Sequence, residues 1–408
     1  MSKREVVFID GARTAFGRIG GTLKEFTAEE LGGIALRGLI DKTKICERGV
    51  VDSVFAGSAF PMARAINPAR WILQAAGLPL STTGSGVEMQ CASAIDGVNH
   101  AAWKILCSHA DSVIAGGMES FSQIPFKYSS SPIPYHLNPM KLLEHQIQPP
   151  PKEGQGHTYG VFEMGLTAEN LQVMYGIPRR EQDEFAFRSQ TLAKKAIDTG
   201  YFEDEIVTVI VPQGKKKPPM EFKKDEHPRL ESMETLAKLP PAFKKDGTVT
   251  AGNSSGLNDG GAFLLMMAAE KAQAWGYKPI ARWICGADYA VDPSIMGIAP
   301  AYAIPIALKR AGLKLADIDV IECNEAFAVQ NLAVIMELEK QTGEKVNMEK
   351  WNPQGGAIAF GHANGASGAR CGMFTMKYLV RTGGRYGLFT SCAGGGQAAV
   401  AIIENLQR

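Results

Sequence analysis

Three common signals are missing from this sequence. No apolar run approaches the roughly 18 residues that a membrane-spanning helix needs, so we expect no membrane partner. The seven cysteines are scattered and lack CxxC spacing, which argues against a disulfide framework and a zinc site and predicts a reducing compartment, the cytoplasm. The 43 Lys+Arg nearly equal the 42 Asp+Glu, so the charge balance gives no sign of nucleic acid as a partner.

Short apolar runs alternate with helix-length amphipathic segments along most of the 408 residues. A chain of this length exceeds what one core usually supports, so we expect two or more core units. Asp10 and Arg13 interrupt the first apolar run, which predicts a strand there and not a signal peptide. The runs are residues 6–10, 53–57, 111–117, 281–286, 319–324 and 386–391. Short runs of this kind between helices are typical of buried strands and predict an α/β fold.

The two ends of the chain resemble each other. Residues 51–60 match 318–327, because each stretch ends an apolar run in small or polar residues followed by Ala-Phe. Residues 90–97 match 361–368, and each is followed by a predicted helix and then by a strand that ends in glycines. The order of these similarities predicts two copies of one α/β unit. Cys91 and His362 occupy matching positions, so we expect them to face each other where the copies meet.

An insert of different composition lies between the copies, from about Glu119 to Thr248. SSSPIPYHLNP and IQPPPKEGQG are typical of loops, whereas residues 165–176 and 179–200 are predicted helices. Lys215–Lys217 with Lys223 and Lys224 form a basic run that is either a solvated loop or a loop near a phosphate-bearing ligand. The domain prediction is an N-terminal half at 1–118 plus 249–273, an inserted loop domain at 119–248 and a C-terminal half at 274–408.

The stretch 355–396 carries one histidine and one cysteine among small residues. His362 follows strand-like AIAF and precedes a predicted helix, where a neutral imidazole can take a proton from a thiol. Cys392 ends a predicted strand and is followed by Ala-Gly-Gly-Gly, whose exposed N–H groups suit a developing oxyanion. A second acidic thiol at Cys392 is suited to general acid/base work. The other six histidines are predicted to be structural: His100, His109, His136, His145, His157 and His227.

Cys91 is the predicted nucleophile. It precedes a helix with a small-residue first turn, where the helix dipole favours the thiolate and lowers the thiol pKa. Asn324 ends a strand and has a side chain that both donates and accepts hydrogen bonds, whereas Glu325 is interpreted as a buried structural acid. The stretch 248–262 is either a simple turn or a loop that lets a ligand approach the backbone. The cysteines predicted to be buried structural residues are Cys107, Cys285 and Cys371.

Over essentially its whole length the chain resembles the thiolase family, which includes acetyl-CoA acetyltransferase and 3-ketoacyl-CoA thiolase. The resemblance rests on ARTAFGRIGGTL, GGMESFSQ, MGLTAEN, RREQDEFAFRSQ, TVTAGNSSGLNDG, NEAFA, GGAIAFGH and CAGGGQ, in that order, with the Cys91 segment among them. It implies a five-layered αβαβα fold built from two duplicated α/β halves with an inserted loop domain. It also implies a coenzyme A-dependent acyltransferase of fatty acid metabolism such as β-oxidation.

The resemblance assigns a role to each site residue. Cys91 would be acylated, His362 would activate it, and Cys392 would exchange a proton with the acetyl-CoA carbanion. Asn324 would hold a water that, with His362, stabilises an enolate oxygen, and the N–H groups of Cys91 and Gly394 would form a second oxyanion hole. No metal or bound cofactor is implied, coenzyme A is the co-substrate, and a homodimer or homotetramer is expected. The residues implied for the coenzyme A path are Ser255, Met164, Leu239, Phe243, Thr235 and Arg229.

Three departures from the family pattern bear on the substrate. Ala363 and Asn364 follow the histidine where a proline and an apolar residue are usual, and Ala-Ser-Ala follows Cys91 in place of Gly/Ser-Ser-Gly. Glu163 stands where acetoacetyl-type enzymes often have a histidine. These changes leave room for a longer, branched or unusual acyl group. Two alternatives remain: a decarboxylating ketosynthase-like enzyme, for which Asn324 would be expected to be histidine, and an inactive acyl-CoA-binding scaffold.

Overall fold

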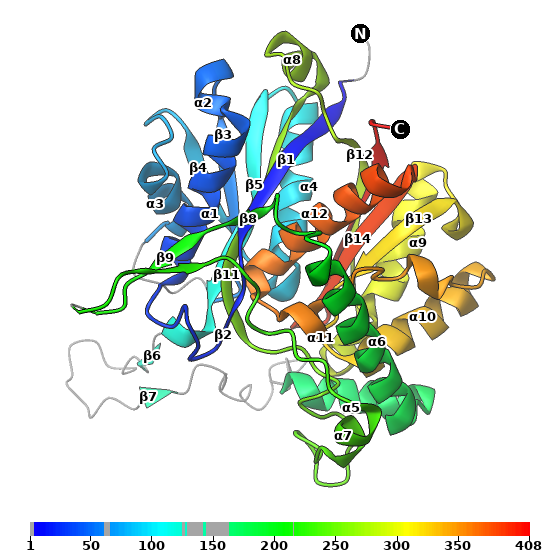
Figure 1. Cartoon of the computed structure of the whole chain (residues 1–408). Coiled ribbons are helices and arrows are strands. Elements are labelled where there is room, and N and C mark those ends of the chain that lie inside the picture. Colours follow the sequence, from blue (N-terminus) through cyan, green and yellow to red (C-terminus); the bar gives the residue numbers. More distant parts are fainter. Residues whose placement is uncertain (1–3, 61–65, 125–126, 129–141, 144–162, 215) are drawn as a thin grey trace, which may run out of the picture.

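Most strands of the chain form one large sheet in two parts (Figure 1). This computed structural model describes residues 4–60, 66–124, 127–128, 142–143, 163–214 and 216–408. The first part has the order β4 (Thr83–Val87), β3 (Ser53–Gly57), β5 (Ser112–Ser120), β11 (Asn258–Ala268) and β1 (Val6–Thr14). The second part continues through β12 (Ala281–Ala290), β15 (Gln397–Asn405), β14 (Tyr386–Ala393) and β13 (Ile318–Cys323). A short antiparallel pairing of β1 with β12 joins the two parts.

The strand directions repeat from one part to the other. In the first part, β3 runs parallel to β5, while β5 and β11, and β11 and β1, are antiparallel. In the second part, β13 runs parallel to β14, while β14 and β15, and β15 and β12, are antiparallel. In the second part, a parallel bridge between Ile321 of β13 and Trp351 corresponds to the parallel pairing of β3 with β4 in the first part. The prediction of two related α/β halves is therefore confirmed.

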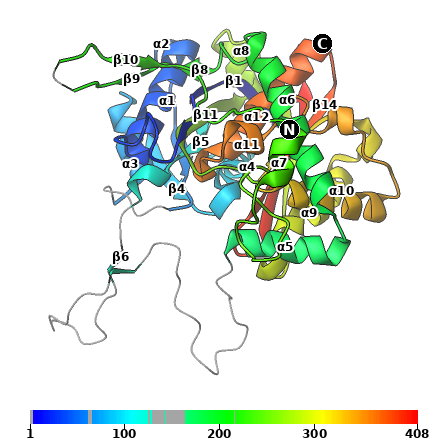
Figure 2. The same cartoon turned by 60° about the horizontal axis from the view of Figure 1, so that its bottom comes forward.

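Helices form three layers around the two parts of the sheet (Figures 1 and 2). On the outer face of the first part lie α1 (Ala28–Thr43) and α3 (Pro68–Ala75), and on that of the second part lie α9 (Ala299–Ala311) and α10 (Ala328–Thr342). Between the two parts, α4 (Ser93–Leu106) packs against α12 (Asn364–Thr382). The layers follow the order helix, sheet, helix, sheet, helix, which is the predicted αβαβα arrangement.

The small residues at the start of α12 are required by its packing. A Cβ on Gly365 would lie 2.4 Å from the Met118 carbonyl oxygen, and one on Gly368 would lie 2.6 Å from Ile95 Cγ1. Larger residues would force α12 away from α4 and from β5, because these contacts involve backbone and buried side chains. The glycine-rich stretch after His362 therefore positions the middle layer.

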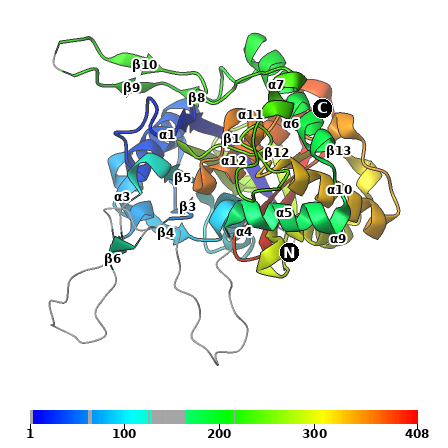
Figure 3. The same ribbon diagram turned by 90° about the horizontal axis from the view of Figure 1, so that it is seen from below.

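The insert contributes elements on two sides of the molecule, with α5, α6 and α7 on one side and the hairpin of β9 and β10 on the other (Figure 3). The helices α5 (Met164–Tyr175) and α6 (Arg179–Asp198) confirm the two predicted helices. In the part of the chain that the structure describes, no helix is long and apolar enough to cross a membrane. The remaining elements are α2 (Ile45–Arg48), α7 (Met233–Lys238), α8 (Ala269–Ala274), α11 (Ala357–Phe360), β2 (Gly17–Arg18), β6 (Lys127–Tyr128), β7 (Leu142–Leu143), β8 (Ile206–Val207), β9 (Val209–Val211) and β10 (Met220–Phe222).

Several local expectations differ from the structure. The apolar run Ala357–Phe360 is a short helix and not a strand, since Gly356 starts it and Gly361, at φ +89°, ends it. The stretch 248–262 is only partly a loop, because β11 begins at Asn258. The basic run surrounds a hairpin strand, β10, and is not loop throughout. Cys107 is exposed, whereas Cys285 and Cys371 are buried as predicted. The two Pro-rich segments lie outside the described residues.

Candidate active site

Cys91 lies in a 3₁₀ turn, Gln90–Ala92, directly before α4. Its side chain is nearly enclosed, with 8% of the residue exposed, and the Gly394 backbone N–H donates a hydrogen bond to the thiol. Burial raises the pKa of Cys91 to about 12, against the lowering effect of the hydrogen bonds from Gly394 and from its own N–H. The prediction that the helix start lowers this pKa is wrong, because desolvation of the thiolate outweighs the helix dipole. Attack by Cys91 therefore requires a base.

His362 supplies a neutral imidazole with a defined tautomer. Its Nδ1 lies 2.7 Å from Ser367 Oγ, and that hydroxyl donates its own hydrogen to the Ala363 carbonyl. Ser367 must therefore accept from Nδ1–H, which leaves Nε2 unprotonated. Burial, together with the positive charge of Arg370, lowers the pKa of His362 to about 3. The imidazole is a base at neutral pH and carries no charge before the reaction.

Asn324 directs its amide at this imidazole from the end of β13. Its Nδ2 lies 3.4 Å from His362 Nε2, and Arg370 Nη2 donates to its Oδ1 at 3.4 Å. Because guanidinium nitrogens only donate, Arg370 identifies Oδ1 as the oxygen and turns the NH₂ group toward His362. Glu325, the next residue, is fully buried and bonded to Ser189 and Asn352, which confirms its structural interpretation.

Cys392 lies at the end of β14 and is completely buried. Burial, and then the neighbouring Cys91, raise its pKa well above the usual value, so the second thiol is also protonated at rest and is not the acidic group predicted. The chain turns immediately after it through Gly395 and Gly396, at φ +86° and +84°. This left-handed turn requires glycine and aims the Gly394 N–H at Cys91.

The loop before β11 fixes the backbone of His362. The His362 N–H lies 3.1 Å from both the Gly256 carbonyl and Asn258 Oδ1. Ser255 N–H donates to the Ala326 carbonyl, so the same loop is tied to the segment that follows Asn324. Ser255, which the resemblance assigns to the coenzyme A path, is thereby joined to the segment that follows Asn324.

A small cavity of about 170 Å³ extends from this loop. Its wall includes Arg229, Thr235 and Leu239, together with Ala251 and Gly252 of the loop. Three of the six residues predicted for a coenzyme A path are therefore gathered in one place. The Arg229 guanidinium is partly occupied, since Nη1 lies 2.7 Å from His227 Nε2 and Nη2 donates to the Ala251 carbonyl at 2.8 Å.

Met164 and Phe243 lie outside the wall of this cavity. Met164, 37% exposed, begins α5, and its sulfur would be 3.6 Å from a Cβ placed on Gly394. The Phe243 ring packs edge-on against Phe327 at 6.0 Å and against Gly165, where a Cβ would meet it. Met164 is therefore close to the turn that carries the Gly394 N–H, and Phe243 packs against the segment that follows Asn324. Glu163 precedes α5 and is exposed, without a side-chain hydrogen bond to the helix start.

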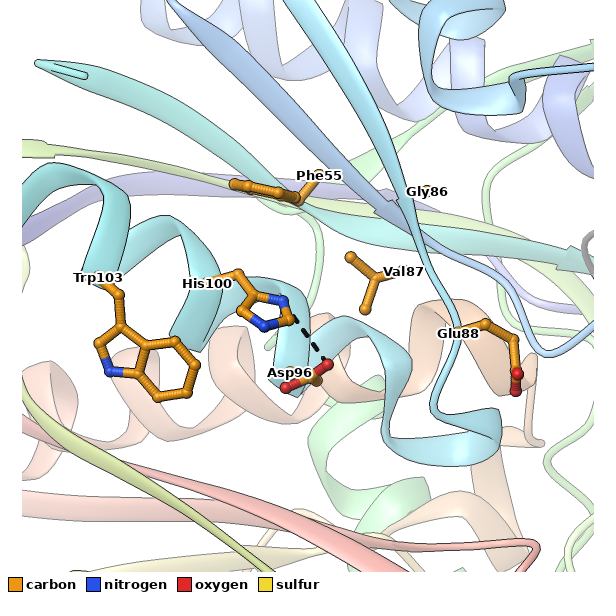
Figure 4. Close-up of a pocket in the computed structure, with 7 residues that line it drawn as sticks. All are labelled: Phe55, Gly86, Val87, Glu88, Asp96, His100 and Trp103. Atoms are coloured by element: carbon orange, nitrogen blue, oxygen red, sulfur yellow. Dashed lines mark ion pairs between the residues drawn. The ribbon is translucent and has the colours of Figure 1, made fainter. Parts of the chain in front are cut away.

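Two other features lie away from this site. The hairpin of β9 and β10, which carries Lys216, Lys217 and Lys223, projects from the side of the molecule opposite α7 and α5 (Figures 1 and 3). That position favours the solvated-loop interpretation of the basic run. A larger cavity of about 430 Å³ lies between β4 and α4 and includes the His100–Asp96 ion pair, at 3.6 Å (Figure 4).

The sequence analysis missed three buried polar side chains around the site: Ser367, Arg370 and Glu119. Glu119 accepts hydrogen bonds from the Ala59 and Gly365 N–H groups, and its burial raises its pKa to about 7. An arginine within the apolar and small residues of α12 was a visible signal. The partners of Glu119 were not visible, because they depend on how distant segments pack. Ser367 gave no signal although its partners His362 and Ala363 are close in sequence, because a serine among small residues is also typical of packing.

Comparison with known proteins gives a consistent result across the chain. Profiles described as "Thiolase, N-terminal domain" and "Thiolase, C-terminal domain" match residues 6–270 and 277–405. An acetyl-CoA acetyltransferase of Syntrophomonas wolfei is 42% identical over 405 residues, 99% of this chain and 100% of the relative. A probable acetyl-CoA acyltransferase of Staphylococcus aureus is 41% identical, with 98% of each chain covered.

Solved structures agree. The Bacillus anthracis acetyl-CoA acetyltransferase has a TM-score of 0.87 at 39% identity, with 99% of each chain covered. Human mitochondrial 3-ketoacyl-CoA thiolase in complex with CoA has a TM-score of 0.87 at 37% identity, with 98% of each chain covered. A duplicated αβαβα fold with two thiols and an imidazole at its centre defines a thiolase-type acyltransferase. The chain belongs to the thiolase family.

Proposed function

We propose that the protein cleaves a 3-ketoacyl-CoA with coenzyme A, and catalyses the reverse Claisen condensation, through an acyl-enzyme at Cys91. The observation that carries this proposal is the meeting of groups from both halves. Cys91 receives a hydrogen bond from Gly394 N–H and interacts electrostatically with Cys392, and the helix α12 that follows the neutral His362 packs against the Cys91 turn. Relatives named acetyl-CoA acetyltransferase, and a related thiolase solved with CoA, support this proposal.

In the first half-reaction, Cys91 Sγ attacks the 3-keto carbon while His362 Nε2 takes the thiol proton. Because both groups are neutral at rest, proton transfer accompanies attack and does not precede it. The C2–C3 bond then breaks, the acyl group stays on Cys91, and the acetyl-CoA enolate takes a proton from Cys392. Asn324 would hold a water that stabilises the enolate oxygen with His362.

In the second half-reaction, the Cys392 thiolate takes the proton of the coenzyme A thiol. The coenzyme A sulfur attacks the thioester, and the Cys91 and Gly394 N–H groups stabilise the oxyanion. Cys91 leaves as a thiolate and recovers its proton from His362. The groups return to their starting protonation states, and the two half-reactions predict ping-pong kinetics.

The coenzyme A path in this proposal runs from the cavity of Arg229, Thr235 and Leu239 past Ser255 to the thiols, with Met164 and Phe243 beside it. Coenzyme A is the co-substrate, and the chemistry uses only the side chains named. The three-part division at residues 118/119, 248/249 and 273/274 is part of the proposal, with the insert supplying much of this path.

A homodimer or homotetramer is also proposed. The strand β4 ends the sheet order, and most of its residues are exposed or half-buried, so its outer backbone groups are available to a second chain. The seven unpaired cysteines support a cytoplasmic location. The ketosynthase-like alternative is disfavoured by the amide of Asn324, and the scaffold alternative by retention of both thiols and the imidazole.

The test is covalent trapping. The wild-type protein incubated with labelled acetyl-CoA is digested and analysed by mass spectrometry, with Cys91→Ala as a matched variant. We expect an acetyl thioester on Cys91 that coenzyme A removes, and parallel initial-rate lines with a panel of 3-ketoacyl-CoA chain lengths. A label elsewhere with Cys91 unmodified contradicts the assignment, and coenzyme A binding without turnover of any chain length supports the scaffold alternative.

A further inference from the structure

Arg370 is a fully buried cation in α12, the helix of the middle layer that begins just after His362. Its side chain lies between the two parts of the sheet and has no exposed surface. Among the described residues, Nε and Nη1 have no hydrogen-bond partner. Burying a guanidinium with unsatisfied donors is costly, so its retention calls for an explanation beyond packing.

The contacts that Arg370 does make are with the candidate site. Nη2 donates to Asn324 Oδ1 at 3.4 Å and to the sulfur of Cys371 at 3.5 Å. The guanidinium carbon lies 4.9 Å from the centre of the Phe374 ring, within the range of a cation–π interaction. Its polar contact outside its own helix is therefore the amide that faces His362.

No carboxylate among the described residues forms an ion pair with Arg370. The acid whose charge acts on it is Glu322 of β13, where burial raises the carboxyl pKa to about 8 and Arg370 only partly opposes this. Glu322 Oε1 also has no hydrogen-bond partner in the described part of the chain. Burial therefore favours the neutral form of this carboxyl, and in the described part of the chain no carboxylate lies within ion-pair distance of the guanidinium. The titratable groups that feel this charge are His362, Glu322 and Cys371.

We propose that Arg370 is a positioning residue for the reaction: its guanidinium orients the Asn324 carboxamide toward His362, and its unpaired charge adds to burial in opposing a second proton on the imidazole. This inference rests on the proposed function, since it names a further participant in that site. Arg370 does not touch the reacting atoms; it acts through Asn324 and through the field that it places on His362. A positive charge behind the amide would also favour negative charge on a substrate oxygen held in front of it.

The experiment compares Arg370→Gln, Arg370→Lys, Asn324→Ala and the double variant Asn324→Ala/Arg370→Gln in thiolysis. We expect Arg370→Gln to lower kcat by about 10- to 100-fold, below the roughly 10²–10³-fold cost of removing an oxyanion donor itself. KM should stay within about twofold of the wild-type value, because the side chain is remote from the surface. In the Asn324→Ala background, the same change should cost less, because the route through the carboxamide is gone and only the field on His362 remains.

A second readout does not depend on turnover. Histidines labelled with ¹³C at Cε1 are titrated by NMR, with His362→Asn to assign the signal. In Arg370→Gln the pKa of His362 should rise, and the acid limb of kcat/KM should move to higher pH. Arg370→Lys keeps the charge but loses the planar fork, so it should retain the wild-type titration with a partly reduced kcat. If Arg370→Gln does not fold, Arg370→Lys still tests the positioning role through its reduced kcat at an unchanged titration.

Arg13→Gln is the matched control, because Arg13 is equally buried but pairs with Glu205 and Asp225. It should lower the melting temperature and leave the His362 titration unchanged. The proposal is overturned if Arg370→Gln costs the same factor with and without Asn324, or if the titration of His362 does not move. Absence of thiolysis in the wild-type protein would instead refute the proposed function, while the titration still reports on Arg370.

Discussion

The helices that begin beside Cys91 and His362 occupy equivalent places in the two halves, yet their surroundings differ. In the repeat, the counterparts of Phe55, Gly57 and Asn99 of the first half are, in that order, Glu322, Asn324 and Arg370 of the second. The first half has an aromatic ring, a glycine and a neutral amide where the second has an acid, an amide and a cation. Asn99 uses its amide to bind Val400 and Trp283 of the opposite half.

This difference shows how one framework came to support two roles. Cys91, as the proposed nucleophile, would require little more than a defined backbone and a nearby N–H group, which small and apolar neighbours allow. His362, as the proposed base, would require a fixed tautomer, an oriented amide and control of its charge, which need polar groups around it. The duplicated framework supplies the positions, and the polar substitutions of the second half supply the chemistry.

Removing the second thiol should separate the two half-reactions and gives the largest expected effect. In Cys392→Ser, acetyl transfer from acetyl-CoA to Cys91 should persist at a reduced rate, because coenzyme A can leave as a thiolate without a proton from Cys392. Thiolysis and condensation should fall by about 10²–10⁴-fold, the usual contribution of a general acid–base group, because the carbanion needs that proton exchange. Intact-mass measurement follows the first step and initial rates the second. Cys285→Ala, a buried thiol under α9, is the control and should change neither. Loss of both steps together would place Cys392 in activation of Cys91.

The residues before Cys91 and His362 both have positive φ, but they should differ in how they respond to substitution. Gln90 has φ +47° and Gly361 has φ +89°, and a Cβ at Gly361 would meet the Asn258 side chain at 2.2 Å. We expect Gly361→Ala to destabilise the fold by several kcal/mol or to displace His362, since backbone strain of about 1–3 kcal/mol adds to the clash. Gln90→Gly should stabilise by up to about 1 kcal/mol. Denaturant titration measures the free energy of unfolding of both variants. Equal changes in the two would contradict the expected difference between the two turns.

Ser367 should make a moderate contribution through the tautomer of His362. Ser367→Ala removes the acceptor for Nδ1–H, so kcat should fall by about three- to tenfold, the size of one neutral hydrogen bond of roughly 1 kcal/mol. Ser367→Thr retains the hydroxyl and tests the same bond. In the first half Asp96 holds the equivalent place and bonds elsewhere, so Asp96→Asn should leave kcat unchanged. If kcat fell more in Asp96→Asn than in Ser367→Ala, the two halves would not differ in the way described.

Glu322 should affect the pH dependence of stability and little else. Its folded pKa, raised to about 8, lies above the usual 4.5, so the folded state binds more protons and its contribution to stability is lost as pH rises from 4.5 toward 8. Glu322→Gln should remove up to about 1.4 kcal/mol of this decline per pH unit. Thermal melts of Glu322→Gln and wild-type protein between pH 5 and 8 measure this difference in pH dependence. The kcat of Glu322→Gln at pH 7 should be nearly unchanged. A kcat loss equal to that of Arg370→Gln would show that Glu322 is charged.

The sequence predicted the strands well because their apolar runs are short, bounded and repeated in the two halves. Residues 53–57 are a strand with the predicted bounds. The run Ala357–Phe360 was misassigned, since four apolar residues fit a helix or a strand and the flanking glycines decide. Cys91, His362, Cys392 and Asn324 were proposed as site residues from their places at element ends. The neutral imidazole was expected, whereas the raised pKa of both thiols was not, because burial depends on the complete fold.

Arg370, Ser367 and Glu119 show where sequence reasoning reached its limit. Each acts through a partner that is distant in the chain or on another turn of a helix, and none belongs to a spacing that signals chemistry by itself. The coenzyme A residues were proposed from resemblance, and the structure places Arg229, Thr235 and Leu239 on one cavity. Their contact with a ligand remains a prediction.

The middle layer of α4 and α12 has a further consequence for how the enzyme can change over evolutionary time. Both helices are enclosed by a sheet on either side, so neither can shift without shearing two hydrogen-bonded surfaces at once. Amide hydrogen exchange in these helices should therefore be among the slowest in the chain. We expect new acyl specificities to arise in the segments around this layer, such as the start of α5 at Met164, while the atoms that make and break bonds stay in place.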